Sequence, residues 1–536
     1  MPIVDLRDIP VAEKIEADIC IVGSGPAGST IARELDSKRL RIVVVESGGI
    51  ARNADVDSLN EIENIGRARV MDQWLVRNRM LGGSSNTWTG RCAPFDEIDY
   101  EARNWVQYSG WPFTAGEVEP FLQRAAPYLG LGLGSGFSDR AFWELFGRPN
   151  FSPEIDEELL VPFFWQFSKD DVNRFDYMRF AKGLLNSAGG VRVILNATVT
   201  NINTDAEGAV VKSVDLRGSD GALREVSAPR IVLCAGGIEN ARLLLASRRA
   251  NSAGLGNQND LVGRFLMDHP RGRLGIFDVA KSEPLQRWLG VYNLKNSKGS
   301  HRFRHGLRLS PSYQRKNGLL NCAVWLNEYV VDADPWNALA RILRGRGTIA
   351  TDALFVAANL GLVAKGLNQF LIQRNGMPRK LDRLELLCIV EQQPDPESRI
   401  TLSDRTDKFG VPISRINWKI NQQEERTVRA IGRLVQAEFR RLSLNELHLD
   451  DWLVRDEGLP LSFPDIAHPT GTTRMSTSPK LGVVDPDCQV HGVRGLFVAG
   501  SSIFPTSSHA NPTHMIVATA IRLADFLKGQ ISNGAR

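Results

Sequence analysis

The chain has 536 residues, of which 43% are hydrophobic and 24% are charged. This composition is typical of a folded globular protein and excludes a largely disordered chain. At roughly 150 residues per domain, the length allows about two to four domains. A formal net charge of only +4 gives no support to a nucleic-acid partner.

Cysteine usage and hydropathy exclude further classes of protein. The six cysteines are widely spaced and form no Cys-x-x-Cys pair, so we expect no zinc, iron–sulfur or other metal site. Residues 1–17 are too charged for a secretory signal peptide. No run of about 20 apolar residues predicts a transmembrane segment. We therefore expect a cytoplasmic protein.

The first predicted elements contain the most specific motif of the chain. An apolar strand at 18–22 leads into the turn Gly23-x-Gly25-x-x-Gly28 and then into a helix over 29–35. Gly23 permits a tight turn, Gly25 lets the backbone approach a pyrophosphate, and Gly28 lets the helix pack closely on the strand. The free N–H groups at the helix N-terminus favour phosphate binding.

A second strand, at 41–45, ends at Glu46, eighteen residues after Gly28. A carboxylate at this position is expected to bind a ribose 2′-hydroxyl. Strand, turn, helix, strand and acid in this order predict an adenine dinucleotide, and the acid favours FAD or NAD over NADP. A coincidental strand–turn–helix unit is the alternative.

A strand in the middle of the chain is expected to join the sheet of this first unit. A loop rich in glycine and serine covers 80–90. Strand runs follow at 191–202, 210–216 and 230–234, separated by turn residues. We expect a small antiparallel meander, followed by a buried strand that ends in glycines and rejoins the first sheet.

From residue 271 the pattern changes to alternating strands and amphipathic helices, such as a strand at 384–390 and a helix over 423–441. A buried strand at 496–501 and a helix over 513–527 come last. Elements of the nucleotide-binding unit therefore recur at the start, middle and end of the chain. We predict two interleaved domains rather than two consecutive ones.

The interleaving predicts two discontinuous domains. Residues 1–100, 190–270 and 465–536 are expected to form the nucleotide-binding domain. Residues 101–189 and 271–464 are expected to form the substrate-binding domain.

Residues 331–380, which could form a lid or an insertion, are the least assignable segment. Their apolar run, 355–363, is short, which favours a pair of core-packing helices because short apolar runs are usually buried. An amphipathic lid or a surface-seeking helix is the alternative.

Several motifs follow one another in a fixed order. They are the glycine fingerprint, Gly-Gly-Ser-Ser at 82–85, Ala-Gly-Gly at 235–237, His-x-x-Gly-Thr-x-x-Met at 468–475 and Asn-Pro-Thr at 511–513. This ordered set resembles the glucose–methanol–choline (GMC) oxidoreductase family. The resemblance implies an α/β fold in which a Rossmann-like FAD-binding domain is interleaved with a substrate domain built on a mainly antiparallel sheet with helices.

The resemblance also implies a chemistry, the oxidation of an alcohol to a carbonyl by tightly bound FAD. Within the family, Gly110–Phe113, Trp88 and Glu391–Pro394 most resemble the bacterial sugar-oxidising branch. That branch includes pyranose 2-oxidases and glycoside 3-oxidases.

His468 matches the catalytic histidine of the family, and Asn511 matches the partner of that histidine. A histidine can accept the hydroxyl proton of an alcohol near neutral pH, while the hydride passes to the flavin N5. Asn511 can donate a hydrogen bond to the developing alkoxide. Two alternatives stay open: His509 as the second group, and purely structural roles in which His468 caps a buried turn and Asn511 caps a helix.

The resemblance further implies the residues that hold FAD. They come from the fingerprint, the acid, the Gly-Gly loop, the later strand ends and the start of the last helix: Gly23, Gly25, Pro26, Ala27, Gly28, Glu46, Ser47, Gly82, Gly83, Ser84, Asn86, Thr87, Trp88, Thr89, Val199, Ala235, Gly236, Gly500, Ser501, Asn511, Pro512 and Thr513. Fungal pyranose 2-oxidases attach FAD covalently through a histidine where this chain has Thr87, so we expect non-covalent FAD. Gln392 and Trp88 are candidate sugar contacts, with a core role as the alternative for each. Asp268-His269-Pro270 also matches a family segment, which is expected to be structural or flavin-adjacent, with His269 as a satisfied loop histidine.

The sequence therefore predicts an enzyme that oxidises a secondary ring hydroxyl, at C3 or C2, of a pyranose sugar or glycoside and passes electrons to O2 or a quinone. A non-sugar alcohol, such as a sterol, choline or an aliphatic alcohol, is the alternative within the family. An NAD-dependent dehydrogenase and a flavin-binding protein without turnover are the alternatives outside it. The sequence does not determine the sugar, the acceptor or the oligomeric state.

Overall fold

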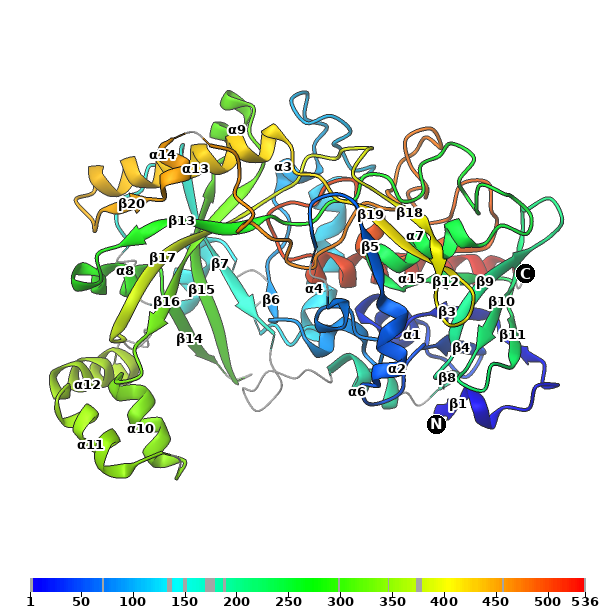
Figure 1. Cartoon of the computed structure of the whole chain (residues 1–536), viewed down its shortest axis with the longest axis horizontal. Coiled ribbons are helices and arrows are strands. Elements are labelled where there is room, and N and C mark those ends of the chain that lie inside the picture. The colour runs from blue at the N-terminus through cyan, green and yellow to red at the C-terminus, as the bar shows by residue number, and fades with distance from the viewer. Residues whose placement is uncertain are drawn as a thin grey trace.

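The computed structural model describes residues 3–69, 72–132, 137–147, 152–168, 179–186, 189–296, 299–345, 347–372, 378–455 and 457–534. Two large sheets dominate the fold and follow one another along its longest axis (Figure 1). A parallel sheet lies at the end that holds both termini, and an antiparallel sheet lies toward the other end.

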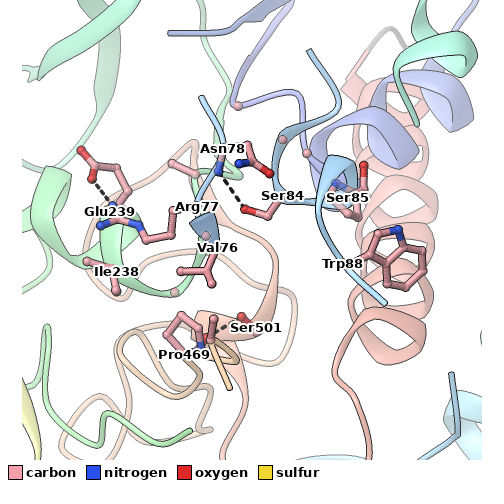
Figure 2. Close-up of a pocket in the computed structure, with 18 of the residues that line it drawn as sticks. Val76, Arg77, Asn78, Ser84, Ser85, Trp88, Ile238, Glu239, Pro469 and Ser501 are labelled. Carbon is pink, nitrogen blue, oxygen red and sulfur yellow. Dashed lines mark hydrogen bonds and ion pairs between the residues drawn. The ribbon is translucent and has the colours of Figure 1, made fainter. Parts of the chain in front are cut away.

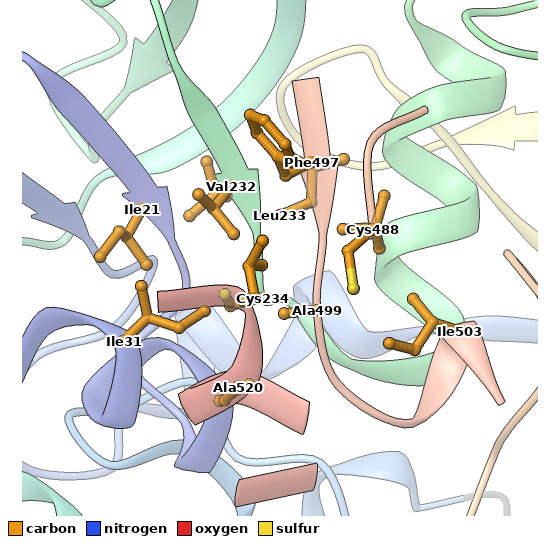
Figure 3. Close-up of a cluster of buried hydrophobic side chains, with 14 of the residues drawn as sticks. Ile21, Ile31, Val232, Leu233, Cys234, Cys488, Phe497, Ala499, Ile503 and Ala520 are labelled. Carbon is orange, nitrogen blue, oxygen red and sulfur yellow. The ribbon is translucent and has the colours of Figure 1, made fainter. Parts of the chain in front are cut away.

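The parallel sheet has six strands in the order β1-β8-β4-β3-β12-β21, and every neighbouring pair is parallel. The strands are β1 (Ile3–Asp5), β8 (Val191–Leu195), β4 (Ile42–Val45), β3 (Ile19–Val22), β12 (Ile231–Leu233) and β21 (Leu496–Val498). Their apolar side chains pack with those of α1 (Pro26–Leu35) and α15 (Thr513–Gly534) in one core (Figure 3). Burial on both faces explains why these strands are continuous apolar runs.

The predicted strand at 191–202 is two strands in the structure. Asn196 adopts a positive φ of 55°, a conformation that Asn tolerates better than most residues, and it separates β8 from β9 (Thr198–Thr204). β9, β10 (Val211–Arg217) and β11 (Leu223–Ser227) pair antiparallel, as expected for the meander. The short strand β2 (Ile15–Glu16) adds to β11 in parallel.

The antiparallel sheet has eight strands. Its main order is β20-β13-β17-β16-β15-β7-β6, and β14 pairs with β15. The strands are β20 (Leu447–Leu449), β13 (Arg271–Phe277), β17 (Leu381–Val390), β16 (Cys322–Val330), β15 (Gly299–Leu309), β14 (Val291–Asn296), β7 (Leu160–Phe167) and β6 (Arg91–Cys92). One face packs under α13 (Gln422–Arg441) in a core of its own. The opposite face contributes Phe163, Trp165, Ala323, Trp325 and Ile389 to the core shared with the parallel sheet.

The remaining elements are short and connect these layers. A three-stranded sheet contains β18 (Arg399–Thr406), β19 (Pro412–Asn417) and β5 (Ile62–Asn64). The other helices include α2 (Ala54–Asp57), α3 (Glu97–Tyr100), α4 (Ala115–Tyr128), α5 (Asp139–Phe146), α6 (Arg179–Leu185), α7 (Gly236–Ala246), α8 (Glu283–Trp288), α9 (Pro311–Asn317) and α14 (Asp451–Val454).

The described part of 331–380 contains α10 (Pro335–Leu343), α11 (Ile349–Ala357) and α12 (Leu360–Leu367), with a short π-helix, Asn368–Ile372, after α12. These α-helices project from the antiparallel sheet (Figure 1). Their apolar side chains are largely exposed, as in Leu354 at 69%. The expectation of a core-packing pair is therefore wrong, because these helices lie beyond the core. Among the described residues, no single helix is long and apolar enough to cross a membrane. Taken together, α11 and α12 have the length and composition of a membrane span, but they are bent by 76° relative to each other.

The turn between β3 and α1 has the close packing that the glycine fingerprint predicts. Gly23 has a φ of +102°, and Pro26 is the first residue of α1. A Cβ atom at Gly28 would lie 2.0 Å from the carbonyl oxygen of Gly23. The helix can therefore approach the strand only with glycine at this position.

We expect Gly28→Ala to lower the free energy of unfolding by about 1–3 kcal/mol, because the added methyl group collides with backbone that cannot rotate away. Urea denaturation measures this change. Gly529→Ala is the matched control: this exposed glycine in α15 has nothing within 4 Å of its Cβ position, so alanine should raise stability by up to ~1 kcal/mol. Equal stability of Gly28→Ala and the wild type would contradict this account of the turn.

Candidate active site

A cavity of about 470 Å³ lies between the carboxyl ends of the parallel strands and one face of the antiparallel sheet. Ligands of open parallel sheets bind at this edge. The predicted residues that line the cavity are Gly23, Gly25, Pro26, Glu46, Ser47, Gly83, Ser84, Thr87, Trp88, Thr89, Val199, Ala235, Gly236, His468, Ser501, Asn511, Pro512 and Thr513. Figure 2 shows that the loops contributing Ser84, Trp88, Pro469 and Ser501 come from distant parts of the sequence.

Two glycine-containing turns meet at one end of this cavity. The backbone N–H of Gly82 donates to Ser24 Oγ at 3.1 Å. A Cβ atom at Gly83, whose φ is +58°, would lie 2.8 Å from the Cα of Gly25. The glycine backbones of these two turns and the N-terminus of α1 form a cradle that suits a pyrophosphate. Residues with side chains in place of these glycines would fill this cradle.

Glu46 lies beside this cradle, at the end of β4. Its Oε2 accepts from the N–H and the hydroxyl of Ser24, at 3.1 and 2.6 Å, and its Oε1 accepts from the N–H of Gly48 at 3.0 Å. Burial raises the pKa of Glu46, against the lowering effect of these hydrogen bonds. The carboxylate is therefore held rigidly at the cavity wall where a ribose is expected.

A second strip of the cavity wall, residues 75–79, carries no sequence motif. Arg77 and Arg79 each lie 3.0 Å from Glu239 at the start of α7. Burial opposes ionisation of Glu239, but the arginines around it, led by Arg79, lower its pKa to about 2. This network joins the loop to α7, and Figure 2 shows Arg77 and Glu239 together. Only the tertiary structure brings these residues to the site.

His468 lies in the cavity wall with both ring nitrogens in contact with other side chains. Its Nδ1 is 3.1 Å from Nδ1 of His269, and its Nε2 is 3.5 Å from Nδ2 of Asn511. Burial lowers the pKa of His468 to about 3, His269 adds to this effect, and Asp268 opposes it. The imidazole is therefore neutral at neutral pH and able to accept a proton.

The neighbours of His269 determine which nitrogen of His468 carries the proton. His269 Nε2 lies 3.1 and 2.9 Å from the carbonyl oxygens of Ser507 and Ser508, and a carbonyl can only accept, so this nitrogen is protonated. Burial lowers the pKa of His269, which leaves its Nδ1 as an acceptor. His468 therefore donates through Nδ1–H, and its unprotonated Nε2 faces Asn511.

An ionic network holds the backbone on either side of His468. The N–H of His468 donates to the carboxylate of Asp268 at 3.0 and 2.9 Å. Arg69 lies 2.6 Å from Asp268 and 3.0 Å from Asp465. The prediction that His269 is only a satisfied loop histidine was incomplete: it is satisfied by carbonyls, but it also contacts His468. The adjacent Asp268-His269 pair was the available signal in the sequence.

His509 occupies a different environment from Asn511. Its ring packs on Phe163, with ring centroids 5.2 Å apart, and its Nδ1 is 3.7 Å from Asp96. Asp96, Asp99 and His509 form a cluster with metal-ligating atoms. Asn321 Nδ2 donates to both carboxylates at 3.0 Å. The structure therefore places Asn511, and not His509, beside His468.

Some predicted contacts lie outside the cavity. Gln392 is buried: its Oε1 accepts from the N–H of Asp268 and from Trp418 Nε1, both at 2.7 Å, and its Nε2 donates to the carbonyl of Lys419 at 2.8 Å. Its amide is thus used within the fold, which corrects the expectation of a sugar contact. Ala27, Gly28, Gly82, Asn86 and Gly500 support the surrounding turns without lining the cavity.

The antiparallel sheet supplies lining residues that the sequence analysis missed. They are Arg91, Trp165, Arg271, Trp325 and Ile389, from five different strands. Figure 1 shows how far apart these strands lie along the chain. No local pattern could have found them, because strand pairing alone makes them neighbours.

Comparison with known proteins identifies two family models along the chain. A model described as FAD dependent oxidoreductase matches residues 18–250, and a model described as GMC oxidoreductase matches residues 394–520. A crystal structure of formate oxidase aligns with a TM-score of 0.58 and 19% identity, over 97% of this chain and 100% of that chain. The predicted fold class is confirmed.

The curated relatives found include a sugar dehydrogenase, a diol dehydrogenase and a glycoside oxidase. The large subunit of fructose dehydrogenase from Gluconobacter japonicus is 26% identical over 348 residues, which is 64% of this chain and 55% of the relative. The 2-methyl-1,2-propanediol dehydrogenase of Mycolicibacterium austroafricanum is 26% identical over 97% of this chain and 96% of its own. A C-glycoside 3-oxidase from Arthrobacter globiformis is 34% identical over 27% of each chain. The glycine cradle, the placement of Glu46 and the family matches agree on FAD as the cofactor.

We expect acid precipitation of the holoprotein to release all of the flavin. Thr87, which donates to Asn78 Oδ1 at 2.7 Å, offers no nucleophile for a covalent link. Among the described lining residues, the candidates for such a link are His468 and Cys234, and burial keeps Cys234 protonated by raising its pKa. Absorbance of the supernatant and the washed pellet measures the release. Yellow colour left in the pellet would show that one of these two residues binds FAD covalently.

Proposed function

Because the chain belongs to the GMC oxidoreductases, which oxidise alcohols with FAD, we propose that it oxidises a secondary ring hydroxyl of a pyranose sugar or glycoside, at C3 or C2, to a ketone. One observation carries the proposal: the unprotonated Nε2 of His468 and the amide of Asn511 lie 3.5 Å apart in the wall of a cavity that also has indole rings in its wall.

His468 is proposed as the base. As the alcohol is oxidised, its hydroxyl proton passes to Nε2 of His468 while the carbinol carbon loses a hydride and the C–O bond becomes a carbonyl. FAD, when bound, supplies the acceptor for that hydride. Asn511 donates a hydrogen bond to the substrate oxygen, whose negative charge grows as the proton leaves, and this amide has no proton affinity with which to compete against His468.

The choice of a sugar rests on the lining and on two relatives. Trp88, Trp165 and Trp325 line the cavity, and a few polar groups among apolar walls are typical of small-molecule sites. Fructose dehydrogenase and C-glycoside 3-oxidase, by their names, act on sugars or glycosides. The electrons are proposed to pass to O2 or to a quinone.

A non-sugar alcohol is the second candidate within the family. The relative that aligns over nearly the whole chain is named as a dehydrogenase of 2-methyl-1,2-propanediol, a small aliphatic alcohol. A substrate panel that contains sugars, glycosides and short diols separates the two candidates, because only the favoured class should reduce the flavin at low concentration.

We expect His468→Ala to bind FAD normally but to be reduced by substrate at least about 10²-fold more slowly, because the hydroxyl proton loses its acceptor. Anaerobic stopped-flow absorbance of the flavin measures the rate. His448→Ala is the control, since His448 lies exposed on β20 and does not line the cavity. A near-wild-type rate in His468→Ala would rule out this residue as the base.

We expect His269→Ala to slow flavin reduction by about 10-fold or more, because His468 then loses the acceptor that fixes its tautomer. Its removal should also raise the pKa of His468, since His269 helps to lower it, so the acid limb of kcat/KM should move to higher pH. His269→Gln should recover part of the rate, because a glutamine amide can both accept from His468 and donate to the carbonyls. An unchanged pH profile in His269→Ala would contradict the positioning role.

A further inference from the structure

The antiparallel sheet presents one continuous face to the cavity, and this face contains arginines. In an antiparallel pair, directly opposite residues share a face. Arg91 is opposite Phe167, Trp165 is opposite Arg304, and Arg271 is opposite Ile389. Trp325 lies two residues along β16 from Ala323, which is also opposite Ile389, so these side chains belong to the same face.

Arg91 is held on this face by aromatic rings rather than by an acid. Its guanidinium carbon lies 5.1 Å from the ring centroid of Trp325, 5.9 Å from that of Phe167 and 6.0 Å from that of Trp165. Its Nε is buried and makes no hydrogen bond. Within the described ranges, no carboxylate lies within ion-pair distance of Arg91.

Arg271 also lacks an acidic partner among the described residues. No ion pair or side-chain hydrogen bond joins it to another described residue, although it lines the cavity. Arg304 and Arg271 both repel the charge of Arg91, and burial together with this repulsion lowers the pKa of Arg91 to about 9. Arg91 therefore still carries its charge at neutral pH, without a counter-ion.

This arrangement is unlike that of other arginines in the same protein. Arg103 is fully buried and lies 2.5 Å from Glu391, and Arg69 is paired with two aspartates. Leaving the half-buried charge of Arg91 without a partner is costly, whereas Arg271 is exposed and its unpaired charge is free to meet a ligand. The paired arginines stabilise the fold, whereas Arg91 and Arg271 have charge left to bind a ligand.

The indole of Trp165 is a further group without a partner. Its side chain is 1% exposed, and its Nε1 makes no hydrogen bond within the described structure. Gly306, on the neighbouring strand β15, makes room for this ring, because a Cβ there would lie 2.5 Å from it. Buried donors are normally hydrogen-bonded, and Trp165 lines the cavity, so its N–H is available to a group bound there.

We propose that the substrate is an acidic sugar or glycoside, whose carboxylate, phosphate or sulfate group is bound by Arg91 and Arg271. This inference rests on the proposed function and narrows its substrate class. Planar guanidinium groups with free donors suit such oxyanions.

The position of Arg271 links this anion site to the catalytic base. Arg271 is among the charges that lower the pKa of His468, so the two side chains act on each other within one cavity. An anion bound at Arg271 offsets this charge and makes His468 a stronger base. The substrate therefore helps to activate the residue that deprotonates it.

The pyrophosphate of FAD does not account for these arginines. The cradle that suits it lies at the glycine turns that follow β3 and precede α1, in the other sheet. Arg77 and Arg79, which are nearer in sequence to that cradle, are already paired with Glu239. Arg91 and Arg271 lie on β6 and β13 of the antiparallel sheet.

The test compares matched neutral and anionic substrates on the holoenzyme. Methyl β-D-glucopyranoside is paired with methyl β-D-glucuronide, and glucose with glucose 6-phosphate and glucose 6-sulfate, which separates carboxylate, phosphate and sulfate. We expect at least one anionic partner to show a kcat/KM for flavin reduction about 10-fold or more above its neutral counterpart. Arg91→Gln and Arg271→Gln should remove this preference.

Arg273→Gln is the matched control. Arg273 lies two residues from Arg271 on β13, but its charge is paired with Asp450 at 2.9 Å and Glu385 at 3.3 Å. This variant should keep the preference for the anionic substrate. The proposal is overturned if the wild type shows the same kcat/KM for neutral and anionic sugars. It is also overturned if Arg91→Gln and Arg271→Gln keep the wild-type ratio of anionic to neutral kcat/KM.

A binding measurement separates failure of this inference from failure of the proposed function. Acetate, inorganic phosphate and sulfate are titrated separately into the holoenzyme, and the change in flavin absorbance reports binding. Binding that is lost in Arg91→Gln and Arg271→Gln supports the anion site even if no sugar reduces the flavin, in which case only the sugar assignment fails. Reduction by neutral sugars without anion binding refutes the anion site and leaves the proposed function intact.

Discussion

The proposed chemistry of this protein depends on one hydrogen bond, between Nδ1 of His468 and Nδ1 of His269. Two carbonyl oxygens on the far side of His269 leave only one arrangement of protons that satisfies every partner. The lone pair of His468 is therefore directed toward Asn511 before any substrate arrives. Burial keeps both rings neutral at neutral pH, so this arrangement persists there.

The two sheets contribute to the site in different ways because they expose different parts of their backbone. The parallel sheet offers strand ends, where turns with bare glycine backbone can surround a dinucleotide. The antiparallel sheet contributes one of its faces, where tryptophan, arginine and isoleucine side chains from five strands line the cavity. The segment with His468, the proposed base, lines the cavity between the two sheets and is held by Asp268 and Arg69.

The sequence predicted well those parts of the protein that follow from local physics. Gly28 and Glu46 could be placed because strand, turn and helix restrict one another over fewer than thirty residues. The predicted strand over 191–202 failed at Asn196, where one residue with positive φ sends the chain from one sheet into another. The projecting helices of 331–380 were misjudged because short apolar runs do not reveal whether a core lies beneath them.

By itself, the sequence predicted the cofactor cradle, because it is encoded in a short motif whose spacing is physically restricted. The resemblance of its ordered motifs to the GMC family implied the fold class and the proposed roles of His468 and Asn511. Only the tertiary structure decided that His269 directs the proton of His468, that Gln392 is used inside the fold, and that Arg91 and Arg271 line the same cavity. These contacts join residues that are far apart in the chain. Their energies depend on strand register and burial, which arise only once the whole chain has folded.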